Sequence, residues 1–322
     1  MAARRKRTAR PRSASTRPAR FLLFALGVLV GALAAGFLAG WRVNFVPTAL
    51  RPTLRAPLRP THPGSTPAPA PQRIDARPPG AHPGASQAPF RTRRPVAEPE
   101  TPGRLRVAVI FDDAGYNLRT AREVLALPRP VTISVLPDLP FSTPIAEEAA
   151  RRGVEVILHL PVQPDNPALD PGPGRITVDM SDEAIARTVE SDFATVPGAA
   201  GANNHMGSRG TADPRLMRAV LGVVKTRALF FVDSLTSPQS VAAETARAMG
   251  VPTAVRAVFL DNQDNDEYVR GQFHALIRAA QIQGQAIAIG HVGKVTARVL
   301  GEMLPEFDEA GIRLVPVSAL VR

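Results

Sequence analysis

The segment LRVAVIFDD (Leu105–Asp113) is an apolar run that ends in two adjacent carboxylates. Further apolar runs along the chain also end in polar side chains of the kinds that bind metal or transfer protons. These side chains are Asn203, Asn204, Asp233, Asp261 and three histidines, His159, His205 and His291. Short runs that alternate with helical stretches predict parallel strands joined by helices. Because active sites gather at the carboxyl ends of parallel strands, the pattern is typical of an enzyme.

Strand-like segments recur from Leu105 to the C-terminus. They lie near residues 105–111, 130–135, 154–158, 199–203, 228–232, 255–260, 285–289 and 312–317. The predicted fold is therefore of the α/β class: a (β/α) barrel of seven or eight units, complete or incomplete, over residues 104–322. We expect one transmembrane helix and a disordered linker to precede it.

Several helix ends can be predicted from local residues. Thr143-Pro144, Asp213-Pro214 and Ser237-Pro238 each pair a capping side chain with a proline suited to the first helical position. Ser181 precedes two acidic residues that suit a first helical turn. Gly153, Gly250 and Gly311 follow helical runs, where glycine commonly ends a helix.

The charge of the chain is unevenly distributed. Residues 1–103 hold 17 Lys/Arg and 3 Asp/Glu, a net charge of +14, whereas residues 104–322 hold 22 and 25, a net charge of −3. The basicity therefore belongs to the tail, which argues against a nucleic-acid-binding domain. The chain has no cysteine, which excludes thiol nucleophiles, disulfides and Cys-ligated zinc.

The N-terminal third is predicted to be a membrane tether. Residues 21–41 form an uncharged apolar run that would span about 31 Å as a helix, close to the thickness of a bilayer core. The arginine-rich tail, residues 1–20, keeps the N-terminus in the cytoplasm by the positive-inside rule. A cleaved signal peptide is the alternative, but its apolar region is usually shorter. Residues 42–103 are rich in proline and are predicted to be a disordered spacer.

Two histidines and one carboxylate at successive strand ends suggest a metal site. His159 and His205 with one aspartate would supply the three protein ligands of a catalytic zinc or similar ion. Of the pair Asp112-Asp113, one carboxylate can bind the metal while its neighbour accepts a proton. A turn or a helix cap would explain one of these aspartates, but two less well.

Six segments together resemble the divergent branch of the polysaccharide deacetylases. They are FDDAGY, GVEVILHLPVQP, GANNHMGS, FFVDS, VFLDN and AIAIGHVGKVT, in this order over residues 104–322. The resemblance implies a (β/α) barrel that is often incomplete, a divalent metal, and hydrolysis of N-acetyl groups from amino-sugar polymers.

The resemblance also implies roles for individual residues. Asp112 matches the proton-accepting aspartate, Asp113 the metal-binding one, and His291 the histidine that protonates the departing amine. His159 matches the first histidine of a His-x-x-x-His metal motif, in which Gln163 occupies the second position. The arginine-proline motif of the mainstream enzymes is absent, and NNHMGS stands in its region. We infer that His205 replaces the missing ligand.

Other polar residues are candidates for supporting roles. Asp233 and Asp261 could orient imidazoles or bind sugar hydroxyls, and capping or turn formation is their alternative role. Asn204 and Gln163 are further candidates near the metal or the substrate, and Arg209 near the rim could steer a glycan.

Two functions remain open. The first is a membrane-anchored, metal-dependent deacetylase, with zinc as the expected ion, that acts on polysaccharide or a peptidoglycan-type glycan. Its domain would lie in the periplasm and its anchor in the bacterial inner membrane, with no nucleic-acid partner. The second is a catalytically silent glycan-binding or scaffold protein of the envelope. Glycoside hydrolysis fits less well, because adjacent carboxylates are badly placed to flank a bond from opposite faces.

Overall fold

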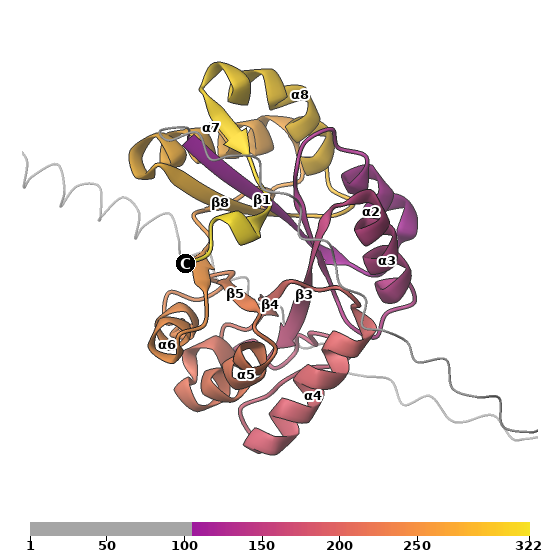
Figure 1. The fold of residues 1–322 in the computed structure, drawn as a ribbon, viewed down its shortest axis with the longest axis vertical. Coiled ribbons are helices and arrows are strands. Elements are labelled where there is room, and N and C mark those ends of the chain that lie inside the picture. Colours follow the sequence, from indigo (N-terminus) through magenta and orange to yellow (C-terminus); the bar gives the residue numbers. More distant parts are fainter. Residues whose placement is uncertain (1–104) are drawn as a thin grey trace, which may run out of the picture. The chain divides into compact units, whose positions relative to one another are not determined.

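The computed structural model describes residues 105–322, which fold as one curled parallel sheet surrounded by helices (Figure 1). The strands are β1 (Leu105–Ala114), β2 (Thr132–Val135), β3 (Glu155–Val162), β4 (Gly201–Met206), β5 (Phe230–Asp233), β6 (Thr253–Val255), β7 (Val258–Phe259), β8 (Gln285–His291) and β9 (Ile312–Leu314). The helices are α2 (Leu118–Leu125), α3 (Ser142–Arg152), α4 (Asp182–Thr195), α5 (Pro214–Thr226), α6 (Ala242–Met249), α7 (Asp266–Gln283) and α8 (Thr296–Glu309), with short 3₁₀ turns at Gly210–Ala212 and Val317–Ala319.

Eight strands follow one another in the hydrogen-bonded order β6-β5-β4-β3-β2-β1-β8-β7, and β9 pairs with the start of β1. The two outer strands, β6 and β7, are joined through Arg256 and Ala257. The Arg256 N–H donates to Asp233 O on β5, and the Ala257 N–H donates to Ile287 O on β8. The sheet is thus an incomplete barrel. Its two edge strands, β6 and β7, are connected by a kink in the chain at Arg256 and Ala257. The predicted α/β fold of repeated strand–helix units is confirmed.

The alternation of side chains along each strand separates two apolar clusters. Val107, Val109 and Phe111 of β1 pack in the large cluster with the helices, whereas Ala108 and Ile110 face the inside of the curled sheet. Because side chains alternate along a strand, the next inward-facing residue of β1 is Asp112. The strand pattern therefore carries polar residues to the mouth of the barrel.

The C-terminal segment fills the opposite end of the barrel. Val315, Val317 and Leu320 belong to the inner apolar cluster. The Val317 N–H donates to Thr132 Oγ1 at 3.0 Å, and the Ser318 N–H donates to Glu155 Oε1 at 3.1 Å. This end of the barrel is thus closed by the chain itself, while the carboxyl ends of the strands carry the candidate site.

Some predicted boundaries differ from those observed. The segment predicted near 255–260 is two short strands, because the chain kinks at Arg256 as it changes partners from β5 to β8. The strands predicted to end at residues 158 and 203 continue to Val162 and Met206.

The predicted helix ends are confirmed in most cases. Asp213 caps α5, Ser181 caps α4, and the three predicted glycines have positive φ at helix ends. Two predicted starts are wrong. Thr143 lies inside α3, where its hydroxyl donates to Thr195 O, and Ser237-Pro238 lies in a turn before α6. At Thr143 a tertiary hydrogen bond replaces the local cap, whereas the Ser237 hydroxyl exchanges hydrogen bonds with Gln239 inside the turn.

The predicted tail, anchor and spacer, residues 1–103, lie outside the described residues. Within residues 105–322, no helix is both long and apolar enough to span a bilayer.

Asp192 of α4 is a buried acid that lacks a hydrogen-bond partner among the described residues. Its side chain is 1 % exposed, and neither carboxylate oxygen meets a donor. Burial, reinforced by the nearby charge of Asp138, raises its pKa to about 8. Since this pKa lies above the ordinary 3.8, the folded state favours the protonated acid. The contribution of Asp192 to the free energy of unfolding is therefore largest below pH 3.8, where the acid is protonated in both states. This contribution is lost as the pH rises through about 8.

Asp192→Asn is therefore expected to stabilise the protein, and more so as the pH rises. Each pH unit between the two pKa values corresponds to roughly 1.4 kcal/mol. Melting temperatures of both proteins between pH 5 and pH 9 test this, with the exposed Asp165→Asn as the control. Parallel curves for wild type and Asp192→Asn would show that burial does not hold the proton on Asp192.

Candidate metal centre

The carboxyl ends of four strands bring the candidate residues together. Asp112 of β1 is in register with His291 of β8, and His159 of β3 is in register with Asn203 of β4. His205 lies two residues further along β4, on the same face of the sheet as Asn203. Residues from distant parts of the chain therefore meet at one end of the barrel.

A bulge in β1 directs both adjacent aspartates to this place. The pairing with β2 advances three residues on β1, from Phe111 to Ala114, but only two on β2, from Ile133 to Val135. Asp113 lies in this bulge with φ of 62°, a left-handed conformation that is uncommon outside glycine. An unkinked strand would point neighbouring side chains to opposite faces. The extra residue re-aims Asp113, so that both carboxylates approach His159.

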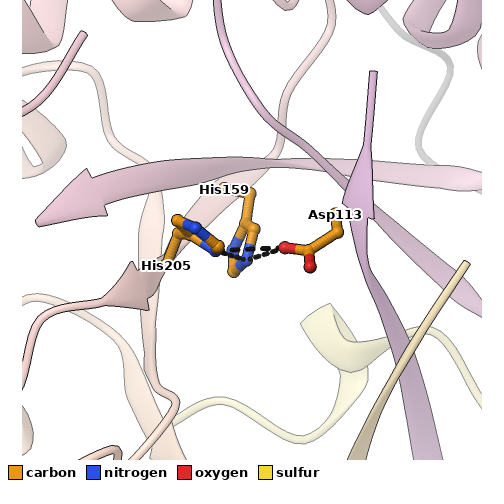
Figure 2. A group of neighbouring side chains, drawn as sticks. All are labelled: Asp113, His159 and His205. Carbon is orange, nitrogen blue, oxygen red and sulfur yellow. Dashed lines mark hydrogen bonds and ion pairs between the residues drawn. The ribbon is translucent and has the colours of Figure 1, made fainter. Parts of the chain in front are cut away.

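Three ligand-type atoms form a nearly equilateral triangle (Figure 2). Asp113 Oδ1 lies 3.2 Å from His159 Nε2 and 3.0 Å from His205 Nδ1, and the two nitrogens are 3.1 Å apart. Figure 2 shows the three side chains pointing toward one another. Ligand atoms of a tetrahedral zinc ion are roughly 3.3 Å apart, since zinc bonds to nitrogen and oxygen are about 2.0–2.2 Å long. The triangle matches one face of such a site.

The carboxylate oxygen at the Asp113 corner of this triangle lacks a hydrogen bond. Asp113 Oδ1 is buried and, despite the short distances, meets no donor in hydrogen-bonding geometry. A buried polar atom without a partner is costly unless something satisfies it. A divalent cation bound by one carboxylate and two imidazoles would do so, and this donor set suits zinc. The residues present therefore fit a divalent metal.

Charge coupling supports the same conclusion. Burial alone would raise the pKa of Asp113, but His159 and His205 outweigh it and hold that pKa well below its usual range. Burial would lower the pKa of His159, but Asp112 and Asp113 outweigh it and raise that pKa. The two carboxylates thus create a negative potential that favours positive charge on the neighbouring imidazoles. The same potential favours a bound cation.

Asp112 lies beside the triangle and is almost completely buried, with 3 % of its surface exposed. The Asn203 amide donates to its two oxygens at 2.9 and 3.2 Å, and Asp112 Oδ2 lies 3.6 Å from His159 Nε2. Burial raises the pKa of Asp112 more than His159, His291 and Asn203 lower it. A carboxylate with a raised pKa is suited to accept a proton.

His291 faces the triangle from β8. Its Nε2 lies 3.8 Å from Asp113 Oδ2, while its Nδ1 donates to Asp261 Oδ1 at 2.8 Å. Asp261 Oδ2 also accepts from the His291 backbone N–H and from Thr296 Oγ1, both at 2.7 Å. This close approach requires glycine at position 290, because a Cβ there would lie 2.8 Å from Thr296 and 3.1 Å from Asp261. Burial opposes protonation of His291, but Asp261, Asp112 and Asp113 raise its pKa to about 9.

The remaining candidate residues contact the backbone of nearby loops. Asp233 accepts from the Leu235 N–H and Ser240 Oγ, and Asn204 accepts from the Ser234 N–H. Asp233 and Asn204 thereby fix the conformation of the loop after β5.

Gln163 bonds to loop backbone and contributes no atom to the triangle. Its Oε1 accepts from the Val178 N–H, and its backbone O accepts from the N–H groups of Arg209 and Gly210. It thus ties together the loops that follow β3 and β4. The Arg209 side chain is exposed in the loop after β4.

Sequence patterns did not assign roles to Ser134, Asn203 or Thr296. Ser134 Oγ donates to Asn203 Oδ1 at 2.6 Å, and Asn203 Oδ1 lies 2.8 Å from His159 Nδ1. The alternation that turns His205 inward also turns Asn203 inward, two residues earlier. This spacing adds to the position of Asn203 after an apolar run, while the contacts of the two hydroxyls depend on the curvature of the sheet.

Comparison with known proteins shows which protein family the chain resembles. A family model described as divergent polysaccharide deacetylase matches residues 109–321. An uncharacterized protein of Haemophilus influenzae is 35 % identical over 211 residues, which are 66 % of this chain and 72 % of that protein. The uncharacterized protein YibQ of Escherichia coli is 36 % identical over 229 residues, 70 % of each chain.

A solved structure shares the fold. The crystal structure of an uncharacterized protein from Agrobacterium tumefaciens superposes with a TM-score of 0.66 at 25 % sequence identity. The superposition covers 69 % of this chain and 92 % of that protein.

Proposed function

Because the chain belongs to the divergent polysaccharide deacetylase family, we propose that it is a metal-dependent hydrolase that removes N-acetyl groups from an envelope polysaccharide. The observation that carries this proposal is the triangle formed by Asp113 Oδ1, His159 Nε2 and His205 Nδ1. Asp112 and His291 flank this triangle with properties that suit a proton acceptor and a proton donor.

The proposed metal is zinc, held by Asp113, His159 and His205. A bound zinc ion would polarise the acetamide carbonyl and make a water molecule more acidic. The contribution of the chain is to hold the three ligand atoms 3.0 to 3.2 Å apart at the mouth of the barrel.

Asp112 is the proposed general base. It accepts a proton from the water whose oxygen bonds to the acetamide carbon. Its burial and its hydrogen bonds from Asn203 fix the carboxylate beside the triangle.

His291 is the proposed general acid. Its Nδ1 is held by Asp261, so Nε2 faces the site. The Nε2 proton passes to the amine nitrogen as the carbon–nitrogen bond breaks, which yields acetate and a free amine. With its pKa near 9, His291 carries this proton at neutral pH.

An exposed aromatic side chain supports a glycan substrate. Tyr116, three residues after Asp113, is 61 % exposed. An exposed ring offers an apolar face on which a sugar can stack. We further propose that residues 21–41 anchor the protein in the bacterial inner membrane, so that the domain reaches a polysaccharide or peptidoglycan-type glycan in the periplasm.

The proposal is tested with full-length protein purified in detergent. Metal analysis is expected to find one divalent ion per chain, and acetate is expected to be released from acetylated amino-sugar polymers. Removal of the ion with a chelator should stop the release, and added zinc should restore it. A folded protein that binds no metal and releases no acetate from any such polymer would refute the proposed function.

The pH dependence of the reaction tests the role of His291. Because His291 must be protonated to donate, activity should fall as the pH rises through its pKa, near 9. Asp261→Asn removes the charge that contributes most to raising this pKa. The alkaline limb of the kcat profile should therefore move to lower pH in this variant. An alkaline limb that stays in place while the variant remains folded would show that another group donates the proton.

A further inference from the structure

The side chain of Asn203 connects two parts of the proposed site. It is completely buried, and its Nδ2 donates to Asp112 Oδ1 at 2.9 Å and to Oδ2 at 3.2 Å. Its Oδ1 lies 2.8 Å from His159 Nδ1 and accepts from Ser134 Oγ at 2.6 Å. One amide therefore contacts both the proposed general base and a proposed metal ligand.

The curvature of the sheet makes this bridge possible. Asn203 is on β4 and Asp112 is on β1, with β3 and β2 between them in the strand order. In a flat sheet these residues would be about 14 Å apart, since neighbouring strands are about 4.8 Å apart. Their contact at 2.9 Å shows that their side chains converge inside the barrel.

The hydrogen bonds determine which way the amide points. The NH₂ group of Asn203 faces Asp112 and donates to both of its carboxyl oxygens. Its carbonyl oxygen then faces His159 and can only accept, so His159 Nδ1 must carry a proton. Zinc-binding imidazoles need one nitrogen free of its proton, and the bond at the other nitrogen determines which one it is. In His159 that nitrogen is Nε2, the atom that faces Asp113.

We propose that Asn203 is a positioning residue that fixes His159 with Nε2 toward the metal site and holds both oxygens of Asp112. This inference rests on the proposed function for the roles of those two residues. Ser134 supports it by donating a second hydrogen bond to Asn203 Oδ1. Loss of the amide would disturb metal binding and proton transfer together, because Asn203 contacts both a proposed metal ligand and the proposed base.

Asn203→Leu is the direct test, because leucine has a similar size but neither donates nor accepts. The variant is expected to bind zinc about 10- to 100-fold more weakly in a competition with a chelator, the usual effect of losing a partner of a metal-bound histidine. The visible spectrum of the Co²⁺-loaded protein should change as well, because the ring of His159 is no longer held.

Two further variants make the test specific. Ser134→Ala keeps Asn203 but removes one of its hydrogen bonds, so zinc affinity should fall in the same direction by a smaller factor. Asn204→Ala removes a buried amide from the adjacent position, whose contacts are with Ser234, Met206 and Thr236. It should lower thermal stability and leave zinc affinity unchanged. Zinc affinities of folded Asn203→Leu and Ser134→Ala equal to that of wild type would overturn the proposal.

A measurement without metal separates this inference from the proposed function. In metal-free protein labelled at histidine, NMR should detect a slowly exchanging Nδ1 proton of His159 that disappears in Asn203→Leu. If this proton is present but wild type binds no zinc, the positioning role stands and the deacetylase function fails. If wild type lacks it, or if it persists in Asn203→Leu, the positioning role is wrong whatever the metal affinity.

Discussion

Asp112→Asn is expected to lower the rate of acetate release by about 10²- to 10⁴-fold, the usual contribution of a general base. The amide is isosteric with the carboxylate but cannot take the proton of the attacking water. The metal content should stay at the wild-type level, since the three ligand-type atoms come from Asp113, His159 and His205. The checks are the steady-state rate of acetate release and the zinc content of the same preparation.

This variant also separates the two functions that the sequence leaves open. A catalytically silent scaffold would keep its cellular role with asparagine at position 112, whereas an enzyme would lose it. Complementation of a deletion strain by Asp112→Asn is the cellular readout. Full complementation, together with an unchanged rate of acetate release, would rule out Asp112 as the base.

His205→Ala should have the second large effect, on metal binding itself. His205 supplies one corner of the triangle, so its loss removes a proposed metal ligand. Loss of a residue that only hydrogen-bonds to a ligand weakens metal binding by up to about 100-fold, and loss of the ligand itself should weaken zinc binding by at least that factor. Activity at limiting zinc should fall accordingly. Isothermal titration with zinc measures the effect directly.

Gln163→Ala is the matched control for His205. Gln163 occupies the position at which the His-x-x-x-His motif has its second histidine, but its side chain accepts from the Val178 N–H instead. The variant should lose about 1 kcal/mol of stability, the typical value of one hydrogen bond, and keep its zinc affinity. The opposite pattern, with zinc affinity lost in Gln163→Ala and kept in His205→Ala, would show that the metal lies elsewhere.

The order of elements and the end of the barrel that carries the site were predictable from the sequence. The length and apolarity of runs such as Leu105–Phe111 predict strands. Polar residues that follow several such runs must then gather at one edge of a parallel sheet. His159, His205 and His291 reach the same end of the barrel for this reason.

The local geometry of the site was not predictable in the same way. The bulge at Asp112-Asp113 depends on how β1 pairs with β2, and nothing in the sequence of β1 specifies that pairing. The side-chain bridge from Asn203 to Asp112 depends on the curvature of a sheet whose strands are far apart in the chain. Long-range contacts also decide where local signals fail, as at Thr143, whose hydroxyl donates to Thr195 O instead of capping a helix.

Anomalous diffraction at the zinc absorption edge, from crystals grown with zinc, tests the central claim most directly. We expect one strong peak within about 2.0–2.2 Å of Asp113 Oδ1, His159 Nε2 and His205 Nδ1, the bond lengths of zinc to oxygen and nitrogen. Crystals of Asp113→Asn grown in the same way should show a much weaker peak there. No peak among these three side chains in the wild-type crystals, or a single peak elsewhere in the domain, would contradict the account.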